Sequence, residues 1–285
     1  MIENPTVENG LLSRKPLKLQ AWWAYHRLTS SWRAQPDFLL VGVMKGGTTS
    51  LFRYLSQHPD VLPPFRKEIK YFDCNYFKGN EWYRAHFPLK KKFTNGTKLT
   101  GEATPYYIFH PTAHERIASV VPQAKIIIIL RNPIERAYSH YQHMLRVGRE
   151  PLSFEDAIAA EPERLAGEAE KVAADPRYPT FMHLQYSYLG RGAYLEQIKR
   201  WHLLFPKEHV LILRSEDLYH DTAATMEQAQ AFLGLKTWHP KKDYGVFKEG
   251  SYEPMKAETR EKLTAHFKPQ NEALYEYLGR DFGWE

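Results

Sequence analysis

A glycine-rich segment, GVMKGGTTS over residues 42–50, combines residue types that suit the binding of an anion. It follows a continuous apolar run, DFLLVGV over residues 37–43, and precedes a stretch with helical spacing of apolar residues. Glycines let backbone amides approach an anion closely, and the free amides at the start of a helix favour negative charge. The segment therefore predicts a strand, a phosphate-binding loop and a helix. The candidate ligands are Lys45, Gly46, Gly47, Thr48, Thr49 and Ser50.

The order of residues in this loop differs from that of nucleoside triphosphatases. Their P-loop places Lys and then Ser or Thr directly after the second glycine, whereas here two threonines follow it and the lysine is Lys45. Those enzymes also hold magnesium with an acidic residue at the end of another apolar strand. The apolar run IIIIL, residues 126–130, is instead followed by Arg131. The sequence therefore favours a nucleotide held by protein cations, without a metal ion.

Arg131 stands at the carboxyl end of a predicted buried strand, which is where open parallel sheets bind their ligands. An arginine there suits a phosphate group. Asn132 and Pro133 are typical of the first residues of a helix, and Ser139 then falls about two turns into it. A lone serine in a helix is more often solvated or bonded to its own backbone, but the pairing with Arg131 favours a shared phosphate.

Apolar strands alternate with helical stretches along most of the chain, which predicts an α/β fold with a mostly parallel central sheet and helices on both faces. Further strands are expected at residues 69–72, 99–102, 124–130 and 209–213. Helices are expected near residues 48–57, 81–87, 111–119, 133–147, 181–204, 221–233 and 258–278. Residues 161–177, rich in Ala and Glu, interrupt the alternation and are interpreted as an insertion that could move over a cleft.

Residues 1–36 are expected to form a leader, and residues 37–285 a single domain. Trp22, Tyr25 and Leu28 lie at helical spacing and predict a short amphipathic helix packed on that domain. Contact with a membrane surface and dimerisation are the two alternatives for this helix.

The composition limits the classes of function. The chain of 285 residues has 39 basic and 33 acidic side chains, and this net charge of +6 suits an anionic ligand but not a nucleic-acid arm. Its single cysteine, Cys74, excludes an intramolecular disulfide and has no recognisable activating neighbour. Residues 126–130 form the longest apolar run, far shorter than the ~20 residues that cross a bilayer, so no transmembrane segment or secretion signal is expected. A cytoplasmic, bacterial-type protein is the simplest expectation.

These motifs together resemble the sulfotransferases that use 3'-phosphoadenosine 5'-phosphosulfate (PAPS), within them the carbohydrate type typified by heparan sulfate sulfotransferases and their bacterial relatives. The resemblance spans residues 38–285. The matching stretches are GVMKGGTTSLFRYLSQHPDV (42–61), KEIKYFD (67–73), GEATPYY (101–107), ILRNPIERAYSHY (129–141) and the tail from GSYEPM (250–255) onward.

The resemblance implies a three-layer, P-loop-like architecture and in-line transfer of a sulfuryl group to a hydroxyl or, as a lesser option, an amine. It implies that the loop from Lys45 to Thr49 holds the 5'-phosphosulfate, and that Arg131 and Ser139 hold the 3'-phosphate. Lys45 would stabilise the charge that grows on the departing phosphate. The product would be 3'-phosphoadenosine 5'-phosphate (PAP), and no metal is required.

The resemblance also implies the other groups of the site. Glu68 matches the family's general base, and Glu102 is a second carboxylate that either orients the acceptor or supports the loop. The tail would clasp the nucleotide through Lys248, Gly250, Ser251 and Tyr252.

The acceptor is expected to be a small molecule or a saccharide. Two departures argue against a heparan-like polysaccharide: Ala103 replaces a lysine of many heparan sulfate enzymes, and no cysteine pair brackets residues 248–255. A homodimer is possible. The alternatives are a small-molecule kinase that uses ATP and a non-catalytic nucleotide-binding protein. The carboxylates of Glu68 and Glu102 argue against the latter, because binding an anionic nucleotide gains nothing from them.

Overall fold

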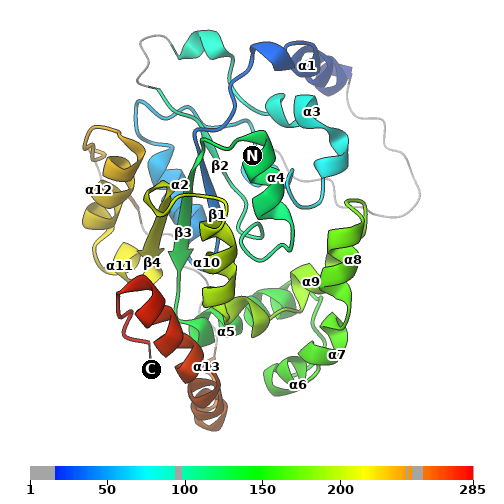
Figure 1. Ribbon diagram of the computed structural model, residues 1–285, viewed down its shortest axis with the longest axis vertical. Helices are drawn as coiled ribbons and strands as arrows, with labels where there is room; N and C mark the ends of the chain where they lie inside the picture. The colour runs from blue at the N-terminus through cyan, green and yellow to red at the C-terminus, as the bar shows by residue number, and fades with distance from the viewer. Residues whose placement is uncertain (1–16, 94–97, 242, 246–252, 285) are drawn as a thin grey trace.

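The computed structural model describes residues 17–93, 98–241, 243–245 and 253–284. Its centre is a four-stranded sheet of order β2-β1-β3-β4, in which every pair of neighbouring strands is parallel (Figure 1). The strands are β1 (Phe38–Gly42), β2 (Gly101–Ala103), β3 (Lys125–Leu130) and β4 (Val210–Arg214). The expected α/β fold with a parallel sheet is confirmed, and these strands lie close to four of the five expected ranges.

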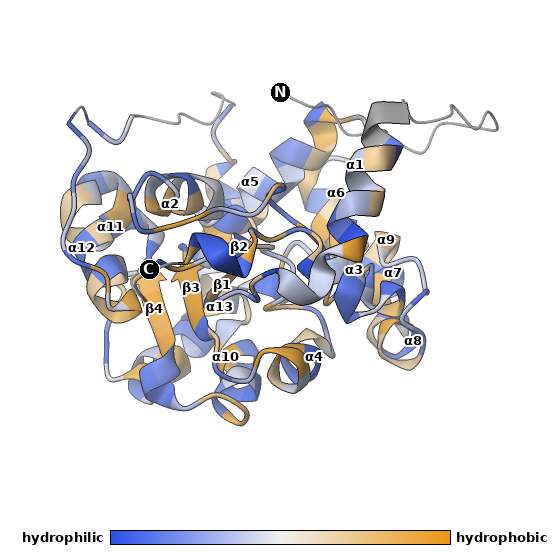
Figure 2. Cartoon of the chain, turned by 90° about the horizontal axis from the view of Figure 1, so that it is seen from above, coloured by the Kyte–Doolittle hydropathy of each residue, from blue (hydrophilic) through white to orange (hydrophobic). Residues whose placement is uncertain are grey.

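Helices cover both faces of this sheet, so the molecule has three layers. Successive residues of a strand point to opposite faces, and in β1 Phe38 and Leu40 pack on one side while Leu39 and Val41 pack on the other. One face is covered by α2 (Thr48–Leu55), α11 (Ser215–His220) and α12 (Thr222–Leu233). The other is covered by α4 (Ala113–Val120), α10 (Tyr194–His202) and α13 (Ala257–Leu278). Seen from above, the apolar strands lie between these two layers (Figure 2).

Shorter elements surround the three layers. The chain before β1 forms α1 (Leu17–Leu28) and η1 (Ser30–Trp32), and the connection between α2 and β2 contains η2 (Tyr76–Lys78), α3 (Asn80–Arg84) and η3 (Lys90–Lys92). After β3 come α5 (Pro133–Arg146), α6 (Phe154–Ala159), α7 (Glu161–Leu165), α8 (Glu168–Ala174), α9 (Phe181–Gln185) and η4 (Gly190–Gly192), and η5 (Lys207–His209) precedes β4. Helices α6 to α9 lie together beside α5 (Figure 1).

The strand expected at residues 69–72 is wrong. Ile69, Tyr71 and Phe72 are buried as a strand would require, but residues 71–74 form a turn. The backbone is left-handed at Glu68 (φ 57°) and Lys70 (φ 56°), which no β-strand accommodates. The apolar run is therefore a buried loop.

The single helix expected over residues 181–204 is also wrong. Two helices, α9 and α10, are separated by the 3₁₀ turn η4. Gly192 in that turn packs so closely that an added Cβ would lie 2.6 Å from the Phe267 ring. The glycines therefore mark a close approach of the turn to α13 as well as a break in the helix.

Residues 161–177 contain helices α7 and α8, joined to the rest by buried carboxylates. Glu161 accepts hydrogen bonds from the backbone amides of Leu189 (2.6 Å) and Gly190 (2.8 Å). Glu150 binds Arg164 at 2.7 Å. Whether this segment moves over the site stays a prediction. Within the ranges given above, no helix is both long and apolar enough to cross a bilayer.

Candidate active site

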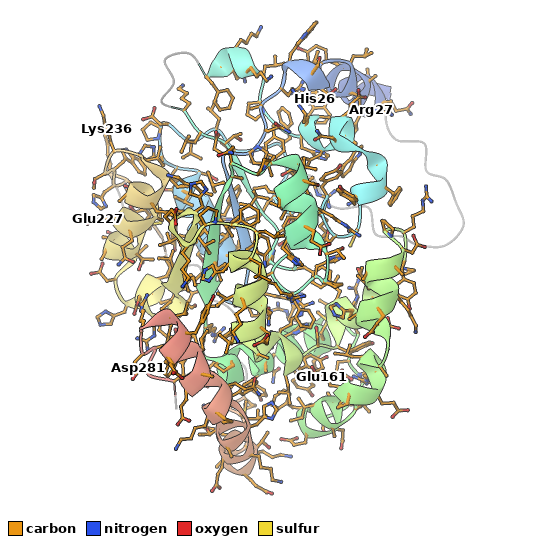
Figure 3. All side chains as sticks on the ribbon, viewed as in Figure 1. His26, Arg27, Glu161, Glu227, Lys236 and Asp281 are labelled. Carbon is orange, nitrogen blue, oxygen red and sulfur yellow. The ribbon has the colours of Figure 1, made fainter. Side chains whose placement is uncertain are left out.

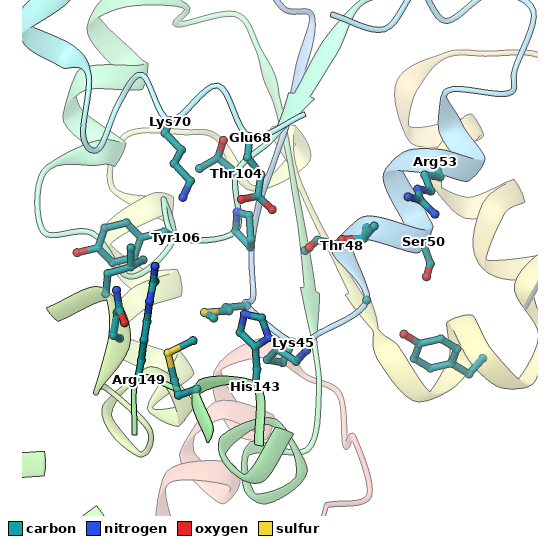
Figure 4. A pocket seen from close by; sticks show the side chains of 18 residues that line it. Lys45, Thr48, Ser50, Arg53, Glu68, Lys70, Thr104, Tyr106, His143 and Arg149 are labelled. Atoms are coloured by element: carbon teal, nitrogen blue, oxygen red, sulfur yellow. The ribbon is translucent and has the colours of Figure 1, made fainter. Parts of the chain in front are cut away.

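A cavity of about 500 Å³ lies at the carboxyl end of the sheet, next to the segments that follow β1 and β2 (Figure 4). Loop 44–50, the loop around residue 68, α5 and α9 all contribute to its wall. Its lining consists of Met44, Lys45, Gly47, Thr48, Thr49, Ser50, Arg53, Glu68, Lys70, Thr104, Pro105, Tyr106, His143, Met144, Arg149, Leu184, Gln185 and Tyr219. Most of the predicted phosphate loop therefore faces one cavity.

Glycines shape the loop between β1 and α2. Gly47 precedes the first residue of α2 with φ +96°, a conformation that a side chain would strain. An added Cβ on Gly46 would lie 2.6 Å from the carbonyl oxygen of Ile129. Gly46 thus packs beneath the loop against β3, while Lys45, Thr48 and Thr49 line the cavity. The first turn of α2 supplies unpaired backbone amides beside them.

The end of β3 holds this loop from below. Arg131 Nη1 donates to the carbonyl oxygen of Lys45 at 3.0 Å, and Tyr194 donates its hydroxyl to the carbonyl of Arg131 at 2.7 Å. Asn132 caps α5 by accepting from the amide of Ile134 at 2.9 Å, as the sequence predicts. Arg131 and the buried Ser139 are not among the lining residues of the cavity. Their role as ligands of a phosphate stays a prediction.

Glu68 reaches the cavity from the opposite side to the loop (Figure 4). Its carboxylate pairs with Lys67 at 3.1 Å, and the same Lys67 ammonium donates to Oγ1 of Thr49 at 2.8 Å. Lys67 therefore connects the carboxylate to the phosphate loop. Lys70 and Arg149 point into the space between the walls (Figure 4).

Three residues with side chains, Lys45, Glu68 and Lys70, have a left-handed backbone in the part of the chain that is described, and all three line this cavity. The left-handed conformation costs a non-glycine residue roughly 1–2 kcal/mol. Strained backbone of this kind concentrates at functional sites, where the surrounding structure maintains it. The left-handed backbone at these three residues therefore lowers the stability of the folded protein, while it directs their side chains into the cavity.

Glu102 lies behind the wall instead of on it. Its buried carboxylate accepts hydrogen bonds from Tyr83 (2.8 Å), Thr104 (3.1 Å) and Tyr107 (3.2 Å). Burial raises the pKa of Glu102 to about 7. The Tyr107 hydroxyl also accepts from the amide of Tyr71 at 2.9 Å, and so joins Glu102 to the loop that carries Glu68. The role of Glu102, either orienting the acceptor or supporting the loop, stays a prediction.

Several lining residues are absent from the sequence-based candidates. Arg53 had a usable signal, because it lies four residues after Thr49 on the same helix face. Tyr106, His143, Arg149, Gln185 and Tyr219 come from separate segments that only the fold brings together. Tyr106 lies in the stretch GEATPYY, residues 101–107, and no local pattern marks the other four.

The four predicted tail ligands, Lys248, Gly250, Ser251 and Tyr252, lie outside the described residues. Described residues on either side of them contact the domain. The Tyr54 hydroxyl of α2 donates to the carbonyl of Gly245 at 2.8 Å, and the Tyr138 hydroxyl of α5 donates to that of Glu253 at 2.8 Å.

Cys74 and the buried His140 are poorly suited to alternative chemistry. Burial raises the pKa of Cys74 to about 12, which keeps the thiol protonated and unreactive at neutral pH. His140 is fully buried, and burial lowers its pKa far below the usual value, while His143 lines the cavity one turn away. In the described ranges no three His, Cys, Asp or Glu side chains gather as metal ligands would.

Comparison with known proteins agrees with this geometry. Residues 35–275 match the family described as the sulfotransferase domain. The membrane-associated sulfotransferase kil1 of Dictyostelium discoideum is 31% identical over 88% of this chain and 66% of its own length. The human bifunctional heparan sulfate N-deacetylase/N-sulfotransferase 3 is 32% identical over 85% of this chain and 30% of its own length. The chain thus spans two thirds or less of these two relatives.

A solved structure supports the same assignment. The sulfotransferase from Alicyclobacillus acidocaldarius is 32% identical, with a TM-score of 0.67 over 87% of this chain and 98% of that one. The kinase alternative is not favoured by any of these matches. With a family match that extends from the segment before β1 to α13, the chain belongs to the sulfotransferase family.

Proposed function

We propose that this protein transfers a sulfuryl group from PAPS to a hydroxyl of a small-molecule or saccharide acceptor. The observation that carries the proposal is the link from Glu68 through Lys67 to Thr49, which joins a carboxylate to the phosphate loop across one cavity. A mere nucleotide-binding protein has no use for a carboxylate in that position.

The donor groups of the cavity fit a PAPS-like anion. Lys45, Arg53, Lys70 and Arg149 line it together with the amide-rich start of α2, while Glu68 is the one carboxylate among the described lining residues. Cations and backbone amides are the groups that bind phosphate and sulfate oxygens. The cationic side chains of the described lining outnumber its one carboxylate, so the cavity favours a multiply anionic ligand.

Each side chain has a distinct task in the proposed reaction. PAPS supplies the sulfuryl group when it is bound and leaves as PAP. Lys45 and the amides at the start of α2 hold the phosphate end and stabilise the negative charge that grows there. Arg131 keeps the Lys45 backbone in place through its hydrogen bond to the carbonyl, and we propose that it also binds the 3'-phosphate with Ser139.

Glu68 is the proposed general base. It lines the cavity, and its partly exposed carboxylate is within reach of a hydroxyl that enters from solvent. It would accept the proton of the acceptor as the oxygen attacks sulfur. Lys67 holds this carboxylate at 3.1 Å and so fixes its direction toward the loop. We propose a positioning role for Glu102, through Tyr107.

We propose the chemical class of the acceptor from the residues that line the wall of the cavity opposite α2. Tyr106, Gln185 and Leu184 line that side, a mixture of aromatic, amide and apolar groups that suits a sugar ring or a small alcohol. Heparan sulfate appears in the name of the human relative described above, which supports a saccharide as the first acceptor to test.

Calorimetric titration with PAP, and separately with ATP and magnesium, tests the cofactor assignment. PAP should bind, and ATP should bind weakly. Arg131→Ala should weaken PAP binding roughly tenfold or more, because charge-assisted hydrogen bonds are worth about 1.5–3 kcal/mol. Lys262→Ala, a change at an exposed lysine of α13, is the matched control and should bind PAP like the wild type.

Two results would contradict the proposal. Binding of ATP with magnesium but not of PAP would restore a kinase function. Binding of PAP without any transfer from PAPS, across hydroxyl and amine acceptors that include saccharides, would leave a nucleotide-binding protein.

A further inference from the structure

Helix α1 presents apolar residues on two sides, and the described residues of the chain cover only one of them. On the inner side, the Trp22 ring lies 5.1 Å from that of Phe65 and the Trp23 ring 5.0 Å from that of His86. His26 Nδ1 lies 2.9 Å from the carbonyl oxygen of Ala85. These contacts fix the orientation of the helix on the domain.

The outer side of α1 is a continuous stripe. Ala21, Ala24, Tyr25 and Leu28 are all exposed, at the spacing of one helix face. The exposed fraction is 52% for Tyr25 and 81% for Leu28. A helix that is apolar on both sides is ordinarily covered on both, so this stripe is unusual on a water-facing surface.

The next element of the chain exposes a further large aromatic side chain. Trp32 of η1 is 67% exposed, although its neighbour Arg33 is buried. An isolated bridge pairs Arg33 with Leu89, which places η3 and its three exposed lysines beside Trp32. Arg27 adds a further exposed cation on α1 (Figure 3).

The two chain segments that form this region carry charges of one sign, although the neighbouring helix α3 has an exposed acidic side chain, Glu81. Residues 17–36 and 88–93 contain no Asp or Glu. We call the exposed face formed by Tyr25, Leu28, Trp32, Lys91 and Lys92 the leader surface. It combines large apolar and aromatic side chains with unbalanced positive charge.

We propose that the leader surface docks on an anionic lipid bilayer. Tyr and Trp rings settle at the headgroup level, leucine enters the acyl boundary, and each lysine near an anionic surface adds attraction. A protein partner that covered an apolar stripe would not require flanking segments free of acidic residues, whereas an anionic bilayer does. The charge complementarity therefore favours lipid.

The leader surface and the cavity occupy opposite ends of the sheet. The leader joins the amino end of β1, whereas the cavity lies at the carboxyl ends (Figure 1). A bilayer bound at the leader surface leaves the mouth of the cavity in water. The proposal is thus independent of the reaction that the cavity performs.

Co-sedimentation with vesicles of phosphatidylserine and phosphatidylcholine, compared with phosphatidylcholine alone, tests this docking. The full chain should bind the anionic vesicles and release them at high salt. Leu28→Ser with Trp32→Ser should weaken binding roughly tenfold or more. Lys91→Ser with Lys92→Ser should weaken it by a similar factor.

Matched variants at other exposed sites are the controls. Leu203→Ser changes a leucine that is 82% exposed at the end of α10, and Lys262→Ser with Lys268→Ser removes two exposed lysines of α13. Both should bind vesicles like the wild type, and melting curves should show that every variant is folded.

Three outcomes would overturn the proposal. These are no binding to anionic vesicles, equal binding to neutral vesicles, and equal loss in the control variants. A dimer in size-exclusion chromatography that Leu28→Ser with Trp32→Ser dissociates, without vesicle binding, would assign the leader surface to a second copy of the chain instead.

Discussion

Glu68 and Lys67 are neighbours in sequence with different tasks at the site. Lys67 bonds to both Glu68 and Thr49, so its ammonium fixes the distance between the carboxylate and the loop. A carboxylate that must accept a proton benefits from a fixed direction more than from a strong ion pair.

Replacing Glu68 by Gln removes the proton acceptor but keeps an oxygen that Lys67 can bind. We expect kcat for sulfuryl transfer to fall about 10²-fold or more, since general base catalysis contributes 10²–10⁴. Affinity for PAP should stay within a few-fold of the wild type. Initial rates and calorimetry measure the two quantities.

Glu81→Gln, at an exposed glutamate of α3, is the control and should leave kcat unchanged. Wild-type turnover in Glu68→Gln, with the fold intact, would remove Glu68 from the mechanism.

Site residues that are neighbours in the sequence could be predicted, whereas those that come from distant segments could not. Lys45, Thr48 and Thr49 are adjacent and form a recognisable loop, and the structure places all three on the cavity. Arg149 and Tyr219 reach the same cavity from segments far along the chain. Their proximity depends on how the helices pack, and the spacing of residues in the sequence carries no information about that packing.

At the scale of elements, the loop of residues 66–73 depends on β2. The amide of Glu68 donates to the carbonyl of Ala103 at 3.2 Å, and Tyr107 bonds both to Glu102 and to the amide of Tyr71. The buried carboxyl of Glu102 is thus at the centre of the hydrogen bonds that support the loop carrying Glu68.

This support gives the protein a pH-dependent stability. Burial raises the pKa of Glu102 from an ordinary 4.5 to about 7, so the folded protein keeps a proton that the unfolded chain has lost. The stability linked to this proton is fully present below pH 4.5 and is lost as the pH rises through 7.

The variant Glu102→Gln has no proton to lose at this position. Between pH 4.5 and 8 the free energy of unfolding of the wild type should fall relative to this variant, by at most about 3 kcal/mol. Urea unfolding at several pH values measures the difference. Glu272→Gln, at an exposed site of α13, should follow the wild type. Parallel curves for Glu102→Gln and the wild type would show that Glu102 is ionised throughout.

Continuous apolar runs predicted two of the strands, but an equally apolar run elsewhere in the chain was misleading. Strand β1 is apolar throughout and ends at Gly42, and β3 is apolar from Ile126 to Leu130 and is followed by Arg131, and both lie close to the expected ranges. The run at residues 69–72 is equally apolar but is a buried loop, because two left-handed residues turn the backbone. Burial alone therefore does not distinguish a strand from a loop that supports a site.

At the scale of the whole molecule, the end of the described chain completes the core. Trp284 is 5% exposed and packs with Phe282 and Tyr194 in the cluster beside α10 and α13. Its backbone amide donates a hydrogen bond to the Tyr275 hydroxyl at 3.0 Å. Tyr194 also bonds to Arg131, so this cluster extends to the phosphate end of β3.

Trp284→Ala should lower the free energy of unfolding by about 3–5 kcal/mol, the usual effect of removing a large buried aromatic ring. Trp32→Ala removes the same side chain from a site that is 67% exposed and should change stability by less than about 0.5 kcal/mol. Denaturant midpoints measure both. Equal midpoints for the two variants would contradict the packing of Trp284 in the core.

The overall architecture was predictable because alternating strands and helices allow few arrangements of layers. The cytoplasmic location, the bacterial origin and a homodimer stay predictions. In the leader, helical spacing alone does not identify the buried side of the helix. Trp22, Tyr25 and Leu28 share that spacing. Trp22 packs on Phe65, while Tyr25 and Leu28 face solvent. Only packing separates the two sides.

The left-handed backbone at Lys45, Glu68 and Lys70 has a consequence for protein engineering. Glycine adopts that conformation without strain, so a search for heat-resistant variants should accept Gly at these positions. Each such variant would gain stability and lose a charged group of the cavity. A library designed to raise heat resistance should therefore keep these three codons fixed, or selection will favour robust proteins that no longer turn over substrate.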